Sequence, residues 1–266
     1  MKKTGPAPAA PLPVPAPPSA GSPSAARQTL AHGTVVYTSA RHRFGTDAML
    51  LSDFAGVHRR WTVCDLGSGC GILPLRWHDA GHRGPCFGVE LDAGGTALLA
   101  RAARESGADG HITALTADLR GALPLTAGAF DAVCCNPPYF TGGYLSQKPG
   151  RAAARHEVCC TVADVCAAAA RLLRDGGRLC LCCPPARLCD CMAAARQAGL
   201  EPKRLRFVRQ RPGAVPWLFL LDARRGGHPG LALLPDLIIE NECGGFSDEL
   251  LRIYGKKTAE EGDRDE

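Results

Sequence analysis

Long apolar segments are absent from this chain of 266 residues. No stretch approaches the ~18 consecutive apolar residues that a membrane-spanning helix needs, and no apolar core of a secretory signal follows the N-terminal lysines. Aromatic residues make up 6% of the chain, and the basic excess is small, with 31 Lys and Arg against 26 Asp and Glu. The composition therefore argues against a membrane or secreted protein. It does not by itself argue for a nucleic-acid partner, and we expect a cytoplasmic protein.

Residues that bury apolar surface are scarce at both ends of the chain. Residues 1–28 are mostly Pro, Ala, Gly and Ser, a composition that cannot form a core, so we expect a disordered tail. Residues 256–266 are highly charged, and we expect them to be frayed. Residues 29–255 are enough for a single domain. A monomer is favoured, although the sequence does not determine the oligomeric state.

Cysteine, in contrast, is abundant, with 14 residues. Cys180 and Cys183 have the Cys-x-x-Cys spacing of many zinc sites, but a second pair at regular spacing is missing. Cys180 and Cys182 lie in the run "GRLCLCC", which is typical of a buried strand in which cysteine serves as a small apolar side chain. We expect neither a metal site nor, in a reducing compartment, a disulfide framework.

Apolar patterns at strand and helix spacing alternate along the central part of the chain. This alternation predicts an α/β fold with a mostly parallel sheet and helices on both faces. Thr46 is the expected N-cap of the first helix, and the helix that begins near residue 161 is expected to stop at Gly176 and Gly177. The predicted strands are 34–37, 62–67, 84–91, 111–118, 129–136, 178–184, 203–209 and 216–224, and the predicted helices are 46–57, 72–81, 94–107, 161–177 and 186–199.

Polar side chains stand at the ends of four successive predicted strands: Asp65, Glu90, Asp118 and Asn136. In open α/β sheets, ligands bind outside the carboxyl ends of the strands. The turn "DLGSGCG" places Gly67, Gly69 and Gly71 directly after the first of these strands, and such glycines allow a ligand to approach the backbone closely. The third glycine of the dinucleotide pattern is replaced by Ile72. The set therefore predicts a nucleoside-type cofactor that is not NAD.

The motifs "VCDLGSGCG", "GVELD" and "TADL" resemble the successive cofactor motifs of class I S-adenosylmethionine-dependent methyltransferases. The resemblance implies a Rossmann-like, seven-stranded sheet whose last strand is antiparallel. It places Asp65 and the glycine turn at the methionine part of the cofactor, Glu90 at the ribose, and Asp118 and Leu119 at the adenine. The implied cofactor-binding residues in these motifs are Asp65, Leu66, Gly67, Ser68, Gly69, Gly71, Glu90, Leu91, Asp118 and Leu119.

The stretch "CCNPPYF" ends the fourth of these strands with an amide, two prolines and an aromatic ring. Prolines cannot continue the ladder of hydrogen bonds, so the chain must turn there. "NPPY" resembles the signature of methyltransferases that act on amino nitrogens. The resemblance implies catalytic roles for Asn136, Pro137, Pro138 and Tyr139, with Asn136 also beside the cofactor. The tyrosine would stack on a base taken out of its helix.

Two further segments resemble the bacterial tRNA (adenine-N6)-methyltransferases that modify valine tRNA beside the anticodon. These are "RHRFGTDAMLLSDFA" before the first strand of the sheet and "ARHE" after the NPPY motif. The resemblance implies that tRNA is the partner and that Phe44, Thr46 and Asp47 belong to the cofactor pocket. Lys148, Arg151 and Arg155 are candidate phosphate contacts.

Three alternatives remain open at this point. Protein-glutamine N5-methyltransferases of release factors and ribosomal RNA guanine-N2 methyltransferases also use NPPY, and a non-catalytic RNA-binding module is an alternative of another class. The release-factor enzymes usually carry an N-terminal helical domain, for which the residues before Thr34 are too few. The arginine-rich segment 204–211 is consistent with either a solvated strand face or an RNA contact.

Overall fold

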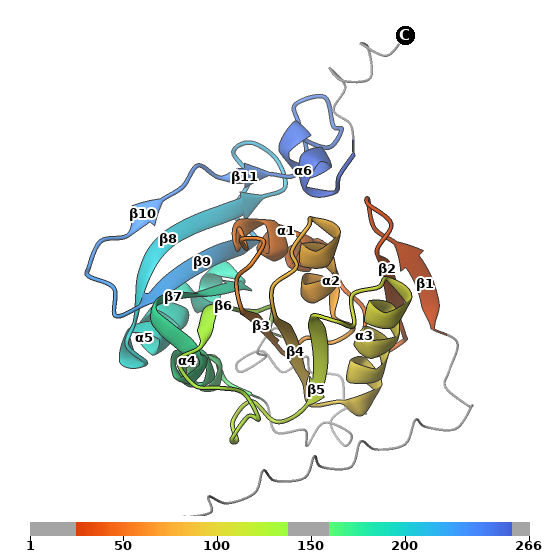
Figure 1. The fold of residues 1–266 in the computed structure, drawn as a ribbon. Helices are drawn as coiled ribbons and strands as arrows, with labels where there is room; N and C mark the ends of the chain where they lie inside the picture. Colours follow the sequence, from red (N-terminus) through yellow and green to blue (C-terminus); the bar gives the residue numbers. More distant parts are fainter. Residues whose placement is uncertain (1–24, 138–159, 257–266) are drawn as a thin grey trace, which may run out of the picture.

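A single sheet forms the centre of the molecule in the computed structural model, which describes residues 25–137 and 160–256 (Figure 1). Its strand order is β10-β8-β9-β7-β6-β3-β4-β5, and β11 also pairs with β8. The strands are β3 (Val63–Leu66), β4 (Cys86–Glu90), β5 (Ile112–Thr116), β6 (Phe130–Cys135), β7 (Leu173–Cys183), β8 (Leu200–Arg209), β9 (Leu218–Arg225), β10 (Ala232–Leu233) and β11 (Leu237–Ile238).

The pairing directions confirm the predicted topology. β5, β4, β3, β6 and β7 are parallel neighbours, whereas β9 is antiparallel to both β7 and β8. β9 follows β8 after a short connection, and a short connection can join only antiparallel neighbours. These seven strands match the expected seven-stranded sheet. Two strands of two residues each, β10 and β11, extend it in parallel to β8 and were not predicted.

Helices cover both faces of the sheet, as predicted. One apolar cluster contains α1 (Thr46–Phe54), α2 (Ile72–Asp79) and α3 (Ala93–Glu105), and the other contains α4 (Val162–Leu172) and α5 (Leu188–Gln197). A hairpin of β1 (Ala26–Thr29) and β2 (Val35–Thr38) packs beside α3, and α6 (Asp248–Ile253) packs near β11 and α1 (Figure 1). The short 3-10 helix η2 (Pro185–Arg187) leads into α5. No helix in the described ranges has the length and apolarity needed to cross a bilayer.

The cysteine-rich run forms the buried strand β7, which confirms that interpretation. Cys180 and Cys182 belong to the cluster with α1, and Cys183 belongs to the cluster with α4, because neighbouring side chains of a strand point to opposite faces. All three are at most 2% exposed. Every cysteine in the described segments is a free thiol, and those segments contain no group of three or more His, Cys, Asp or Glu side chains that would hold a metal ion.

Two predictions about helix ends were wrong. The helix α4 ends at Leu172, and Gly176 and Gly177 lie inside β7, because Leu173 already pairs with Phe130 before an irregularity in the ladder. A Cβ on Gly177 would lie 2.9 Å from the Phe130 carbonyl oxygen, so this glycine permits close strand contact. The N-cap of α1 is Gly45, with no side-chain cap. The first described strand, β1, begins at Ala26, inside the segment 1–28 that the composition sets apart.

Candidate active site

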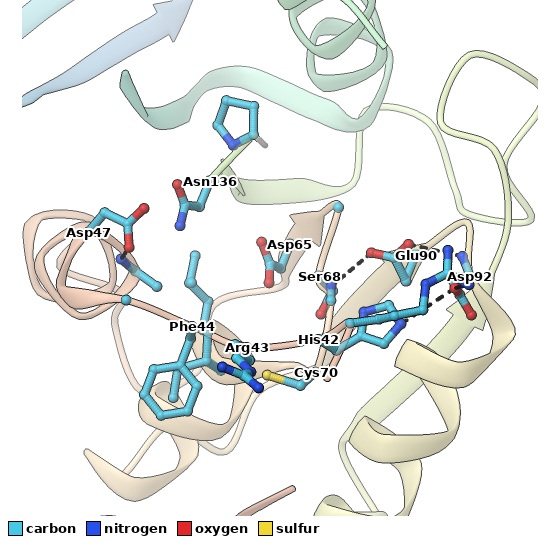
Figure 2. A pocket seen from close by; sticks show the side chains of 18 of the residues that line it. His42, Arg43, Phe44, Asp47, Asp65, Ser68, Cys70, Glu90, Asp92 and Asn136 are labelled. Carbon is cyan, nitrogen blue, oxygen red and sulfur yellow. Dashed lines mark hydrogen bonds and ion pairs between the residues drawn. The ribbon is translucent and has the colours of Figure 1, made fainter. Parts of the chain in front are cut away.

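A cavity of about 600 Å³ lies at the carboxyl ends of β3, β4 and β6 (Figure 2). This is the edge of the sheet at which the sequence predicted a ligand. Four segments of the chain supply the lining: the stretch before and into α1, the turn after β3, the end of β4, and the end of β6. The lining residues are Arg41, His42, Arg43, Phe44, Gly45, Asp47, Ala48, Asp65, Gly67, Ser68, Gly69, Cys70, Ile72, Leu73, Glu90, Leu91, Asp92, Asn136 and Pro137.

The glycine turn between β3 and α2 forms the floor of this cavity. Gly67, Gly69 and Gly71 have φ values of 74°, 54° and 81°, a backbone region that side chains with a Cβ rarely adopt. A Cβ on Gly71 would lie 2.2 Å from Leu99 Cδ1, so Gly71 is needed for α3 to pack against the turn. Gly67 and Gly69 line the cavity, whereas Leu66 and Gly71 support the turn from outside the lining.

Glu90 connects the glycine turn to the start of α3. Its Oε2 accepts a hydrogen bond from the Gly69 N–H at 2.9 Å, and its Oε1 accepts one from the Asp92 N–H at 2.9 Å. The next residue, Leu91, is 63% exposed on the cavity wall. The carboxylate is therefore held in position by two backbone donors from opposite sides.

Asp65 is the deeply buried acid of the site, with 2% of its surface exposed. Burial raises the pKa of the Asp65 carboxyl to about 7; the nearby Ser68 side chain opposes the rise and the charge of Glu90 adds to it. No basic side chain in the described segments forms an ion pair with Asp65. A buried carboxyl without a cationic partner is an unfavourable arrangement that a positively charged ligand would relieve.

Asp118 and Leu119 are not part of the cavity lining. Asp118 binds Arg120 through a pair of contacts, with Nη2 to Oδ2 at 2.5 Å and Nε to Oδ1 at 2.9 Å. These hydrogen bonds lower the pKa of Asp118 to about 2. Arg120 lies two residues away on the same turn and neutralises the carboxylate. The predicted contact of this acid and Leu119 with adenine stays a prediction.

The segment before α1 contributes one wall. Phe44 and Asp47 line the cavity, and Asp47 Oδ1 accepts the Ala48 N–H at 2.9 Å. Thr46 does not belong to the lining: its Oγ1 accepts a hydrogen bond from the Tyr254 hydroxyl at 3.2 Å. Thr46 therefore fixes the helix start against the C-terminal part of the domain.

Several residues of the site were missed by sequence reasoning. Asp92 caps α3, since its Oδ1 accepts the Gly94 N–H at 2.7 Å. Its Oδ2 lies 3.3 Å from Arg41 Nη1 and 3.5 Å from His42 Nε2. The Gly94 hydrogen bond and the two basic neighbours lower the pKa of Asp92. A Cβ on Gly95 would lie 2.7 Å from the Gly69 carbonyl oxygen. In "LDAGG", the acid and the two glycines that follow one residue later were the available signal for this capped, tightly packed helix start.

Asn136 and Pro137 close the cavity on the β6 side. Both line it, so the first half of the NPPY motif shares a cavity with the glycine turn and Glu90 (Figure 2). Pro138, Tyr139, Lys148, Arg151 and Arg155 fall outside the described residues, and their roles stay predictions.

The arginines of the segment 204–211, in and just after β8, form ion pairs within the chain. Arg206 binds Glu249 with both terminal nitrogens, at 2.7 and 2.8 Å, and Arg204 binds the buried Asp222 at 2.6 Å. Arg209 pairs with Asp236, and Arg211 pairs with Glu240. Each of these arginines has an acidic partner within the chain, so the segment is better explained as a structural element than as an RNA contact.

Known proteins similar in sequence to this chain are methyltransferases. The methyltransferase small domain family matches residues 28–186. The tRNA1(Val) (adenine(37)-N6)-methyltransferase of Dickeya chrysanthemi (strain Ech1591) is 30% identical over 70% of this chain and 74% of its own length. The enzyme of the same name from Aeromonas hydrophila subsp. hydrophila is 29% identical over 79% of this chain and 88% of its own length.

A solved structure shows the same fold. A "predicted O-methyltransferase" from Agrobacterium tumefaciens has a TM-score of 0.65 and 20% identity, covering 79% of this chain and 98% of the other. The sheet order and the glycine-floored cavity define a class I, S-adenosylmethionine-dependent methyltransferase. The chain belongs to the methyltransferase small domain family and, within it, to the family of the tRNA1(Val) (adenine(37)-N6)-methyltransferases.

The residues present fit this cofactor. The cavity volume is in the range of small-molecule sites, about 300–1,000 Å³. Asp65 is a buried acid without a basic partner in the described segments, suited to a ligand that carries positive charge. The floor is a glycine turn, and Leu91 offers an exposed apolar surface.

Proposed function

We propose that this chain transfers the methyl group of S-adenosylmethionine to the N6 amino nitrogen of an adenine in tRNA. The observation that carries the proposal is the position of Asn136 and Pro137, at the end of β6 on the wall of the cavity that also holds the glycine turn and Glu90. The names of the relatives, tRNA1(Val) (adenine(37)-N6)-methyltransferase, support adenine as the base and tRNA as the substrate.

Three features of the cavity would hold the cofactor, which when bound supplies an electrophilic methyl group on a sulfonium. Asp65 would face the ammonium of the methionine part, because that charge compensates the buried carboxylate. Glu90 would accept the ribose hydroxyls: a carboxylate has about four lone-pair sites, and backbone donors use two of them here. Leu91 would pack against the adenine ring.

Asn136 and Pro137 would prepare the nucleophile. The lone pair of an exocyclic amino nitrogen is delocalised into the ring, so the nitrogen is planar and a weak nucleophile. Two acceptors, Asn136 Oδ1 and the Pro137 carbonyl oxygen, would each take one of its N–H groups, favour a pyramidal nitrogen and direct its lone pair toward the methyl group. This is catalysis by positioning and preorganised electrostatics.

The tRNA would approach from the side of the cavity formed by the segment before α1. Arg43 is exposed at the cavity, where its charge suits a phosphate near the target nucleotide, whereas Arg41 already forms an ion pair with Asp92. Lys148, Arg151 and Arg155 are proposed as additional phosphate contacts and Tyr139 as a stacking partner for the base. We place the reaction in the cytoplasm and favour a monomer.

The test is methyl incorporation from labelled S-adenosylmethionine into unmodified total tRNA, ribosomal RNA and a release factor, followed by digestion to nucleosides and amino acids. We expect label in N6-methyladenosine from tRNA. A second comparison uses transcripts of a valine tRNA with adenine or guanine at position 37, and we expect label in the first alone. Label in guanosine or in protein would replace the substrate assignment, and no label in any of them would favour a binding module.

A further inference from the structure

One buried cysteine of β7 contacts the amide on which the proposed reaction depends. Cys182 Sγ lies 3.0 Å from Asn136 Oδ1. The register of the parallel strands β6 and β7 explains the contact: Cys134 pairs with Cys180 and Cys135 pairs with Leu181, so the next step places Asn136 beside Cys182. The contact therefore follows from the sheet itself.

The thiol is a stable donor in this place. Cys182 is 1% exposed, and burial, followed by the charges of Asp47 and Asp65, raises the pKa of its thiol well above the ordinary value. The sulfur consequently carries its proton at physiological pH. A thiol is both a weak donor and a weak acceptor, so it is able to partner either end of a side-chain amide.

The orientation of the amide matters for the chemistry. Figure 2 shows the nitrogen end of the Asn136 side chain turned toward the cavity, while the oxygen contacts Cys182 on the β7 side. Accepting an N–H group of a substrate requires the oxygen to face the cavity instead. A half turn of the amide about its last side-chain bond would exchange the two ends.

We infer that Cys182 is a positioning residue for Asn136: its thiol donates to Oδ1 in the substrate-free enzyme and accepts from Nδ2 after the amide turns its oxygen toward the substrate. The inference rests on the role proposed for Asn136. Packing explains Cys180 and Cys183 of the cysteine-rich strand β7. The inference adds a function at one further position of that strand, Cys182. Cys182 touches neither substrate nor cofactor in this assignment and acts through Asn136.

Three substitutions in the full-length protein separate hydrogen bonding from packing. Cys182→Ser keeps a donor and acceptor, Cys182→Ala removes both and leaves space, and Cys182→Val removes both but fills the space. We expect the serine variant to keep kcat for tRNA methylation within about twofold, and the alanine and valine variants to lose about threefold to tenfold, in the range of one modest hydrogen bond. KM for tRNA and the Kd for S-adenosylmethionine should stay unchanged in all three.

Cys180→Ala is the matched control, because Cys180 is equally buried two residues earlier on the same face of β7. It should leave kcat unchanged. A loss in Cys180→Ala equal to that in Cys182→Ala would overturn the inference in favour of general packing. Full activity of Cys182→Val, or a serine variant as slow as the alanine variant, would overturn it as well.

A spectroscopic readout makes the inference independent of activity. The chain contains two asparagines, Asn136 and Asn241, so labelling with side-chain ¹⁵N-asparagine gives one nitrogen signal, with its pair of N–H cross-peaks, for each of them, and Asn241 serves as an internal reference. We expect the Asn136 signal to move in Cys182→Ala and to return toward its original position in Cys182→Ser, with no movement in Cys180→Ala. An Asn136 signal that ignores Cys182→Ala means that the contact is absent and overturns the inference. If the signals behave as expected but Asn136→Ala methylates normally, it is the proposed role of Asn136 that fails.

Discussion

Charged side chains gather in two regions of the molecule. One is the cavity at the ends of β3, β4 and β6, and the other is the strand β8. The regions differ in whether the charges have partners within the chain. Around β8, Arg204, Arg206, Arg209 and Arg211 each meet an acid of the same chain. In the cavity, the buried Asp65 has no basic partner among the described residues, and its pKa rises to about 7. A charge with a partner in the same chain is already compensated, whereas a buried acid without a partner is a candidate for contact with a ligand.

The charges of β8 have a further structural consequence. Arg206 joins the strand to α6 through Glu249 and also donates to the Pro235 carbonyl oxygen at 2.8 Å. Arg204 joins β8 to the adjacent β9 through Asp222. The contacts of Arg206 tie α6 and the segment around Pro235 to the sheet, and the Arg204 pair links two strands within it, so a charge count alone gives a misleading indication of RNA binding for this region.

The largest effect is expected at the amide of the cavity. Asn136→Ala should lower kcat about 100-fold to 1,000-fold, the usual cost of losing one preorganised acceptor at a reacting centre. The affinity for S-adenosylmethionine should change little, because the substitution removes a contact to the substrate base. Single-turnover methylation and titration calorimetry measure the two quantities. Loss of cofactor binding together with activity would identify Asn136 as structural and contradict the proposed mechanism.

Substitution of Glu90, in contrast to that of Asn136, should mainly weaken the affinity for S-adenosylmethionine. Glu90→Ala removes the proposed ribose acceptor and also frees the Gly69 and Asp92 N–H groups, so we expect the Kd for S-adenosylmethionine to rise about tenfold to 100-fold. Glu90→Gln is the control that keeps the size of the side chain, and it should fall between the wild type and the alanine variant. Unchanged affinity in Glu90→Ala would remove the ribose assignment.

Asp65 should make cofactor binding depend on pH. Its carboxyl must ionise to meet a cationic ligand, so affinity should be constant above about pH 7 and fall about tenfold for each pH unit below it. The stability of the cofactor-free protein should change with pH in the opposite direction, falling as the pH rises. A raised pKa in the folded state means that the contribution of Asp65 to stability is fully present below about pH 4, near its ordinary pKa, and is lost as the pH rises from there through about 7.

Calorimetric titrations of S-adenosylmethionine between pH 5.5 and 8.5 would measure the first effect, and denaturant unfolding of the cofactor-free protein would measure the second. Asp65→Asn should weaken binding at pH 8 and remove the dependence of binding on pH near 7. A dependence that persists in Asp65→Asn would assign the titration to another group.

The smallest effect is expected for substitutions in β8. They test whether its arginines stabilise the fold and do not contact RNA. Arg206→Ala should lower the free energy of unfolding by about 1–2 kcal/mol, since a partly exposed, two-pronged ion pair is lost. Glu249→Ala should have a similar effect, and the double variant should cost less than the sum. Cofactor affinity and tRNA methylation should be unchanged at temperatures at which the variants are folded. Weaker tRNA binding with unaltered stability would mean that β8 contacts RNA after all.

Much of the fold was accessible from the sequence because it depends on local patterns. Alternating apolar periods predicted the helices α1 to α5 and the seven long strands, but not α6, and the short β8–β9 spacing is compatible only with an antiparallel pair. The places that failed involve partners distant in the chain. Gly176 and Gly177 have the appearance of a helix stop, yet Leu173 pairs with Phe130 and the segment becomes strand. β10 and β11 are too short to have a pattern of their own, and β8 provides the pairing that defines them.

The site divides in the same way. The strand pattern alone indicates that Asp65, the glycine turn, Glu90 and Asn136 lie at one edge of the sheet, because parallel strands all end at the same edge. Four contacts follow only from packing in three dimensions: Asp118 with Arg120 outside the cavity lining, Thr46 with Tyr254, Gly95 with the glycine turn, and Cys182 with Asn136. These contacts depend on the direction and register of side chains, and neither quantity is determined until the strands and helices have packed against one another.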